Sequence, residues 1–146
     1  MLMVIFACGL LIALTTLIHF EVLRALNAGL PTLNIPSRNK LLVVIFTTFA
    51  AHAVEIFIYG LGFFVLIKHM SVGSLVGPAE FSLLNCFFFS AETYTSLGFG
   101  DLTPGGPVRL LAGIEALNGL LLIGWSASYT YIAMERFWRP SIERQH

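Results

Sequence analysis

The stretch Thr93-Tyr94-Thr95-Ser96-Leu97-Gly98-Phe99-Gly100-Asp101 decides the interpretation of this chain. It places two glycines around one aromatic residue, after hydroxyl residues and before an acid, within an otherwise apolar sequence. Glycines at alternate positions allow left-handed backbone angles that other residues resist. A strand that alternates between left- and right-handed angles points successive carbonyl oxygens the same way. Several such strands around one axis can replace the water shell of a cation, so the stretch predicts an ion filter.

The composition predicts a membrane protein. Of the 146 residues, 57% are hydrophobic and 11% are charged, whereas a soluble domain carries about 25% charged residues. Too few polar side chains remain to cover a surface in contact with water, so we expect a lipid bilayer around the chain. The formal charge is zero, which gives no reason to expect nucleic acid as a partner.

Three apolar segments are long enough to span the hydrocarbon, which takes about 20 residues. They run from about Leu2 to Leu23, from Leu41 to Ile67 and from Val108 to Phe137. A fourth stretch, Phe81 to Ala91, is about half a membrane long and fits a re-entrant helix better than a span. A cleaved signal peptide is the alternative for the first segment, but that segment lacks a basic start and a small-residue cleavage site.

Basic residues predict the orientation of these segments. They gather after the first and third spans, at Arg24, Arg38, Lys40, Arg136, Arg139 and Arg144. By the positive-inside rule, we expect a cytoplasmic C-terminus and an N-terminus outside the cell membrane. Lys68 and Arg109 dissent weakly, since both then lie near the outer face. The segment from His69 to Pro107 becomes an external re-entrant loop.

From Phe81 to about Arg136 the sequence resembles the pore module of potassium channels, and as a whole it resembles the small bacterial members of that family. Ser96-Leu97-Gly98-Phe99-Gly100-Asp101 is similar to the family signature T-V-G-Y-G-D. The resemblance implies an all-α integral membrane protein that forms a homotetramer, because one filter strand cannot enclose an ion. It divides the chain into an extra helix and loop at 1–40, a pore module at 41–137 and a short cytoplasmic tail at 138–146. Within the module it implies an outer helix at 41–67, a pore helix at 81–93, a filter at 95–101 and an inner helix at 108–137.

The resemblance also implies the function, which is passive and selective conduction of K⁺ without an organic cofactor or enzymatic chemistry. The filter would comprise Ser96, Leu97, Gly98, Phe99 and Gly100, with K⁺ held by the carbonyls of the first four. Serine and phenylalanine replace the more usual threonine and tyrosine. Two alternatives stay open: a weakly selective cation channel, and a non-conducting pore-derived sensor.

Glu92, Thr95 and Asp101 are expected to support the filter. In some members of the family, an acid at the position of Glu92 shares a proton with the aspartate that follows the filter. Two carboxylates close together in a low dielectric do not both ionise easily. The alternative is that Glu92 caps local backbone groups.

The third span carries candidates for the inner cavity and gate. Gly119 lies near the hinge position of related channels, although close packing against the pore helix is an equally simple role. Ile123, Ala127 and Tyr131 follow it at helical spacing and are predicted to line the cavity. Glu115 is an intramembrane acid, which is a functional candidate by default, but we expect it to hydrogen-bond the re-entrant loop from behind.

Four polar residues in the first two spans are unexpected in an apolar setting: His19, Glu21, His52 and Glu55. Counted from the outer ends, His19 and His52 lie at nearly the same depth, about 25 Å. The antiparallel helices are therefore predicted to join these residues into one cluster. Three roles are open for it: interhelical hydrogen bonds, a proton-sensitive gate or a divalent metal site.

Overall fold

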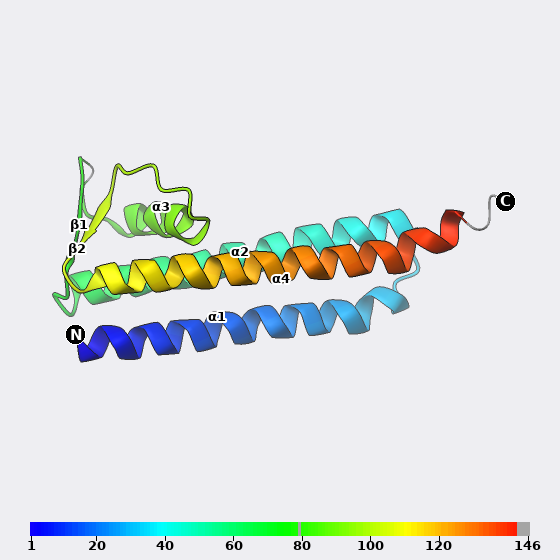
Figure 1. Cartoon of the computed structure of the whole chain (residues 1–146), viewed down its shortest axis with the longest axis horizontal. Helices are drawn as coiled ribbons and strands as arrows, with labels where there is room; N and C mark the ends of the chain where they lie inside the picture. Colours follow the sequence, from blue (N-terminus) through cyan, green and yellow to red (C-terminus); the bar gives the residue numbers. More distant parts are fainter. Residues whose placement is uncertain (79, 143–146) are drawn as a thin grey trace.

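The computed structural model describes residues 1–78 and 80–142, with side chains through residue 137. Three long helices lie side by side in Figure 1: α1 (Leu2–Gly29), α2 (Ser37–Lys68) and α4 (Val108–Ile142). A short 3-10 helix, Leu30–Thr32, follows α1 and leads to the turn before α2. Each long helix is long and apolar enough to cross a membrane, which confirms the three predicted spans. Helix α4 runs past the expected end at residue 137. Residues 143–146 of the expected tail, which include Arg144, lie outside the described part of the chain. The side chains of residues 138–142, which include Arg139, lie outside it as well.

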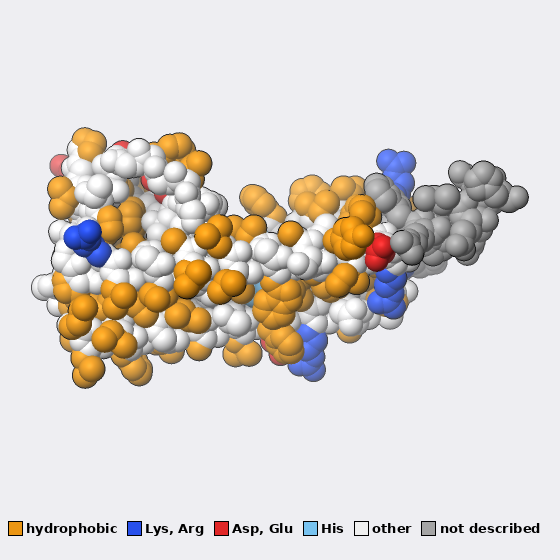
Figure 2. Space-filling view, viewed as in Figure 1, with side chains coloured by type: hydrophobic (Ala, Val, Ile, Leu, Met, Phe, Trp, Pro, Cys, Tyr) orange, Lys and Arg blue, Asp and Glu red, His pale blue; other side chains and the backbone are white. Residues whose placement is uncertain are grey.

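The outward faces of these helices carry large apolar side chains. Phe6, Phe46 and Phe49 are 73%, 70% and 72% exposed, and Figure 2 shows hydrophobic side chains along the length of the bundle. A soluble monomer rarely exposes so large an apolar surface. The chain is therefore a multi-pass membrane protein.

The polypeptide places its connections at two ends of the bundle. The N-terminus, the short helix α3 (Leu83–Tyr94) and a small hairpin lie at one end, and the α1–α2 connection and the end of α4 lie at the other. The hairpin pairs β1 (Ser74–Val76) with β2 (Thr103–Gly105) in antiparallel register, with Leu75 opposite Pro104. It brackets the whole segment from 77 to 102 and brings its two ends together.

Helix α3 begins where a serine side chain replaces a missing backbone partner. The Ser82 Oγ accepts a hydrogen bond from the Asn85 backbone nitrogen at 3.1 Å, which is the usual role of serine before a helix. The helix therefore starts two residues later than the predicted 81–93 and ends one residue later.

The interior of the bundle has three zones. One apolar cluster beside α3 includes Val4, Leu11, Phe63, Phe89 and Leu111, and a second at the opposite end includes Leu23, Leu26, Val44 and Ala133. Between them lies a zone of buried polar side chains, which includes Thr15, His19, Glu55, Asn118 and Ser126. Polar groups in such a position need hydrogen-bond partners, and the partners come from neighbouring helices.

Candidate functional site

The candidate filter segment, residues 95–101, begins with a tight cap on α3. Ser96 has a φ of 57°, its nitrogen donates to the Thr93 carbonyl at 3.0 Å, and the Leu97 nitrogen donates to the Glu92 carbonyl at 2.9 Å. These two bonds around one left-handed residue form a Schellman motif, in which glycine is the more usual residue. Serine accepts the left-handed geometry at a cost, so the cap turns the chain abruptly away from the helix.

The backbone then alternates in handedness. Ser96, Gly98 and Gly100 have φ angles of 57°, 56° and 80°, whereas Leu97 and Phe99 between them keep negative φ. This is the alternation that the glycine spacing predicts. All residues from Thr95 to Asp101 are exposed in the single chain.

Glu92 is the main hydrogen-bond partner of this segment. Its carboxylate Oε2 accepts from the Phe99 nitrogen at 3.2 Å, and its carbonyl also accepts from the Gly98 nitrogen at 3.3 Å. Thr95 Oγ1 donates to the Ala91 carbonyl at 2.7 Å. These bonds fasten the segment to the last turn of α3.

Asp101 has a separate local contact, since its Oδ1 accepts from the Leu102 nitrogen at 2.9 Å. The hydrogen bonds of the described residues do not join Asp101 to Glu92. Glu92 thus has the local capping role that was the alternative, and the shared proton stays a prediction.

Helix α4 supports α3 from behind at two points. The Ser90 hydroxyl contacts both the Ile56 carbonyl, at 2.8 Å, and the fully buried carboxylate of Glu115. This contact confirms the structural role expected for Glu115. One turn along α4, a Cβ on Gly119 would lie 2.2 Å from the Tyr94 carbonyl oxygen. Gly119 therefore allows α4 to pack closely against the end of α3.

The other predicted cavity residues are exposed, whereas Gly119 is covered by the end of α3. Ile123 and Tyr131 are 37% and 58% exposed, and Ala127 is exposed as well. They present one open stripe of α4, while Gly119 is buried against α3. The single chain leaves this stripe available to a partner or to a pore.

Comparison with known proteins assigns the family. Residues 41–136, which is more than half of the chain, match the ion channel family. The chain belongs to that family. Over 77 residues it is 35% identical to the inward rectifier potassium channel Kirbac3.1 of Paramagnetospirillum magnetotacticum, which covers 51% of this chain and 25% of that protein. The chain thus spans about a quarter of the length of that relative. No solved structure matches the chain significantly.

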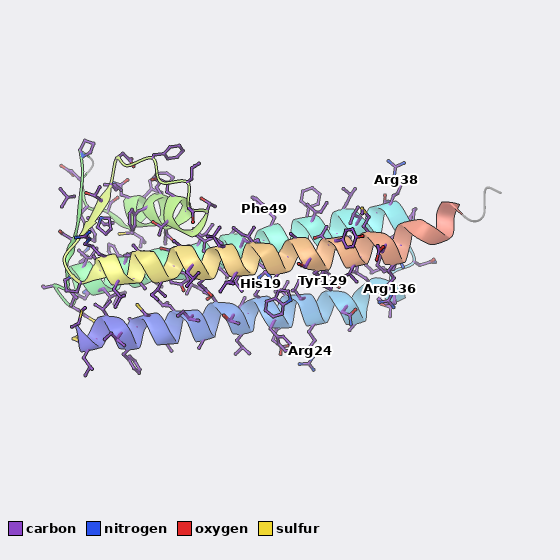
Figure 3. The ribbon with its side chains drawn as sticks, in the orientation of Figure 1. His19, Arg24, Arg38, Phe49, Tyr129 and Arg136 are labelled. Atoms are coloured by element: carbon purple, nitrogen blue, oxygen red, sulfur yellow. The ribbon has the colours of Figure 1, made fainter. Side chains whose placement is uncertain are left out.

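Helix α1 lies outside the residues that match the ion channel family, yet a buried cluster attaches it to them. His19 Nδ1 lies 2.9 Å from Glu55 Oε1, and His52 Nδ1 lies 3.0 Å from Glu55 Oε2. His19 points into the bundle in Figure 3. We call His19, His52 and Glu55 the His–Glu cluster; it confirms that the two histidines lie at one depth.

Glu21 was predicted to join this cluster, and that prediction is wrong. Glu21 is exposed and pairs with Arg24 at 3.1 Å. Residues two apart on a helix do not share a face, so Glu21 points away when His19 points inward. Counting residues gives the depth of Glu21 along the helix axis but not its rotation about that axis.

Two neighbours of the cluster were missed from the sequence. Tyr94, the last residue of α3, donates its hydroxyl to Glu55 Oε2 and lies 2.9 Å from His52 Nδ1. Ser126 Oγ lies 3.0 Å from His52 Nε2 and 3.1 Å from His19 Nε2. The cluster thereby touches all four α-helices.

A second buried contact was also missed. Asn118 Nδ2 donates to Thr15 Oγ1 at 2.9 Å and to the Tyr59 hydroxyl at 3.1 Å. Asn118 lies three residues after Glu115, on the same side of α4, and a polar residue in a span is a signal of this kind of contact. These two bonds join α1, α2 and α4. On α1 they lie at Thr15, one helical turn before His19 and nearer to the end of the bundle that carries α3.

Proposed function

We propose that this chain is the subunit of a passive potassium-selective channel, in which four copies of Ser96–Leu97–Gly98–Phe99–Gly100 surround one conduction axis. This proposal is supported by the membership of the chain in the ion channel family. The relative at 35% identity is named as an inward rectifier potassium channel. That name belongs to the relative, and its extension to this chain is part of the proposal.

The alternation of left- and right-handed residues carries the proposal. Left-handed angles at Ser96, Gly98 and Gly100 are those that a row of parallel carbonyls requires. Rings of such carbonyls replace the hydration shell of K⁺ in potassium channels. Glu92 accepts hydrogen bonds from the backbone nitrogens of Gly98 and Phe99, and these bonds hold this conformation.

A homotetramer is proposed because one chain leaves the segment uncovered. Leu97 and Phe99 are 63% and 74% exposed, although both are apolar and neither lies on a membrane-spanning helix. Contact with neighbouring subunits would bury these side chains. Closed cyclic symmetry is the usual arrangement of homo-oligomers.

The proposed orientation places the N-terminus and the filter segment outside the cell membrane. Arg24, Arg38 and Arg136 lie toward the end of the bundle opposite α3 in Figure 3, which fits a cytoplasmic location. In this arrangement residues 41–137 form the pore module and 1–40 add a helix on its periphery. The exposed stripe of Ile123, Ala127 and Tyr131 would line the inner cavity.

Flux measurements test the proposal. The purified chain is reconstituted in liposomes, and uptake of K⁺ and Na⁺ is followed with and without Ba²⁺. We expect K⁺ uptake that excludes Na⁺ and is blocked by Ba²⁺. Equal uptake of both cations would favour the weakly selective channel, and no uptake of either would refute conduction.

Gly98→Ala tests the alternation itself. The added methyl meets no atom within 4 Å, so steric overlap inside the chain is absent. The left-handed conformation costs other residues about 1–2 kcal/mol each, and the cost recurs in every subunit. Gly124→Ala, which has the same open surroundings without a left-handed φ, is the matched control and should keep K⁺-selective uptake.

A further inference from the structure

The His–Glu cluster presents ligand atoms of three side chains to a common point. One ligand atom each from His19, His52 and Glu55 lie within 4.8 Å of one another. We propose that the cluster binds one divalent transition-metal ion of the Zn²⁺ class, through both Nδ1 atoms and the Glu55 carboxylate. The proposal does not depend on conduction, and it gives helix α1 a defined role.

The hydrogen-bond partners of the cluster are compatible with a cation between its ligand atoms. Ser126 Oγ lies beside both Nε2 atoms, and a hydroxyl has one proton and two lone pairs. If both Nδ1 atoms donate to Glu55, two neutral histidines present two Nε2 acceptors to a single hydroxyl proton. The reverse arrangement, with both Nε2–H groups donating to the two lone pairs of Ser126, satisfies that hydroxyl as an acceptor. Both Nδ1 lone pairs then face carboxylate oxygens, an arrangement that a cation between them stabilises. A mixed pair of tautomers, in which His52 Nδ1 accepts from the Tyr94 hydroxyl, satisfies the same atoms in the metal-free cluster.

The ligand set matches what such a metal prefers. Two imidazole nitrogens and one carboxylate form a known zinc-binding set, with metal–ligand bonds of about 2.0–2.2 Å. His19 Nδ1 lies 2.9 Å from Glu55 Oε1, and His52 Nδ1 lies 3.0 Å from the other oxygen, Oε2. Each carboxylate oxygen therefore faces one ring nitrogen, at a distance near the separation of about 3.3 Å between ligands of a tetrahedral site at those bond lengths. Ligating histidines commonly donate their second nitrogen to an outer partner, and Ser126 is in that position for both rings. The Tyr94 oxygen, 2.9 Å from His52 Nδ1, is placed to serve as the fourth ligand.

Charge balance points the same way. Glu55 is fully buried, and its described ion-pair partners are the two histidines. A buried carboxylate without a compensating positive charge is costly. A divalent cation supplies that charge directly, and it would fasten α1 to α2 next to Tyr94, the last residue of α3. His52, whose side chain is 17% exposed, is the only one of the three ligands that is partly exposed.

Metal content tests the proposal. The full-length protein is purified in detergent, stripped with a chelator, dialysed against Zn²⁺ and assayed by elemental mass spectrometry. We expect about one Zn²⁺ per chain, and a visible spectrum typical of tetrahedral coordination when Co²⁺ is used instead. His52→Ala and His19→Gln should abolish stoichiometric uptake. His69→Ala is the matched control, because His69 is an exposed histidine outside the cluster and its removal should change nothing.

Ser126→Ala separates loss of the site from loss of the fold. It keeps all three ligands but removes the outer acceptor, and such changes weaken metal affinity about 10–100-fold. Absence of Zn²⁺ uptake by the wild type would overturn the proposal. Unchanged uptake in His52→Ala, or an unchanged Zn²⁺ affinity in Ser126→Ala, would overturn it as well. Liposome flux of K⁺ is measured on the same preparations, so failure of metal binding is distinguishable from failure of conduction.

Discussion

Gly119→Ala is expected to displace the end of α3. A Cβ at this position would lie 2.2 Å from the Tyr94 carbonyl oxygen and 2.9 Å from its carbonyl carbon. Both atoms belong to the backbone, so no flexible side chain can rotate away. A carbon and an oxygen in contact lie more than 3 Å apart, so α3 and α4 must separate by about 1 Å, and overpacking forces backbone shifts of this kind.

The expected magnitude follows from two opposing terms. Overpacking typically costs about 1–3 kcal/mol, whereas replacing a helical glycine by alanine gains about 1 kcal/mol of helix propensity. Gly113 lies on the same helix and has no atom within 4 Å of an added Cβ. Gly113→Ala should therefore show the gain in helix propensity without any overlap. The difference between the two alanine variants therefore isolates the overlap, at about 1–3 kcal/mol against Gly119→Ala.

Two assays measure the outcome. Thermal unfolding of the purified protein should give a lower midpoint for Gly119→Ala than for Gly113→Ala, and K⁺ uptake by liposomes should fall in Gly119→Ala alone. The fall is expected because the displaced carbonyl belongs to Tyr94, one residue before the candidate filter segment. If Gly119→Ala matches Gly113→Ala in both assays, the close contact is not structurally significant and a hinge role for Gly119 regains support.

Substitutions at three further positions probe other contacts of the chain. Asn118→Ala removes the hydrogen bonds to two neighbouring helices and should lower the free energy of unfolding by about 1–3 kcal/mol, as measured by chemical denaturation in detergent; no loss would contradict a role in helix attachment. Gly77→Ala would place a methyl 2.1 Å from the Asp101 carbonyl oxygen, so its K⁺ uptake should fall while Gly124→Ala stays unaffected. Glu92→Ala removes the acceptor for the Phe99 nitrogen, a loss of about 1 kcal/mol in each chain, and should lower K⁺ uptake by liposomes. Glu92→Gln keeps an oxygen at that position and should lower the uptake less.

The long helices could be predicted from the sequence because their signal is strong. Each of the three spans exceeds the length that lipid requires, and the structure extends α2 by four residues at its start, from Leu41 to Ser37. The length of the stretch from Phe81 to Ala91 likewise predicted a short helix, which is α3. Apolar length is a property of consecutive residues, so it can be read without knowing what lies beside them.

The hairpin could not be predicted in the same way. Strands β1 and β2 have three residues each, and Thr103–Gly105 contains a proline and a glycine. Neither strand is long enough to show the alternation that identifies a strand. Their pairing depends on contact between segments 27 or more residues apart, which local sequence does not encode.

The polar contacts were predictable in depth but not in rotation. Counting residues along antiparallel helices correctly brought His19 to the level of His52, since rise per residue is constant. The same count wrongly included Glu21, which lies at nearly the same depth on another face. The same count could have been applied to Ser126, but a single serine in an apolar run is only a weak signal of an interhelical contact. Depth and face together would have selected the correct set.

Helix α1 is the part of the chain that family membership does not explain, and its attachment is the most specific feature of the bundle. Lipid gives little hydrophobic drive for one apolar helix to pack on another, so small residues and interhelical hydrogen bonds decide which faces meet. Thr15 and His19 are four residues apart on α1 and share a face; the first binds Asn118 of α4 and the second binds Glu55 of α2. Two polar contacts one turn apart fix both the rotation and the depth of α1 against the residues that match the ion channel family. Because Glu55 also accepts from Tyr94 at the end of α3, the contacts that attach α1 extend to the residue before the candidate filter segment.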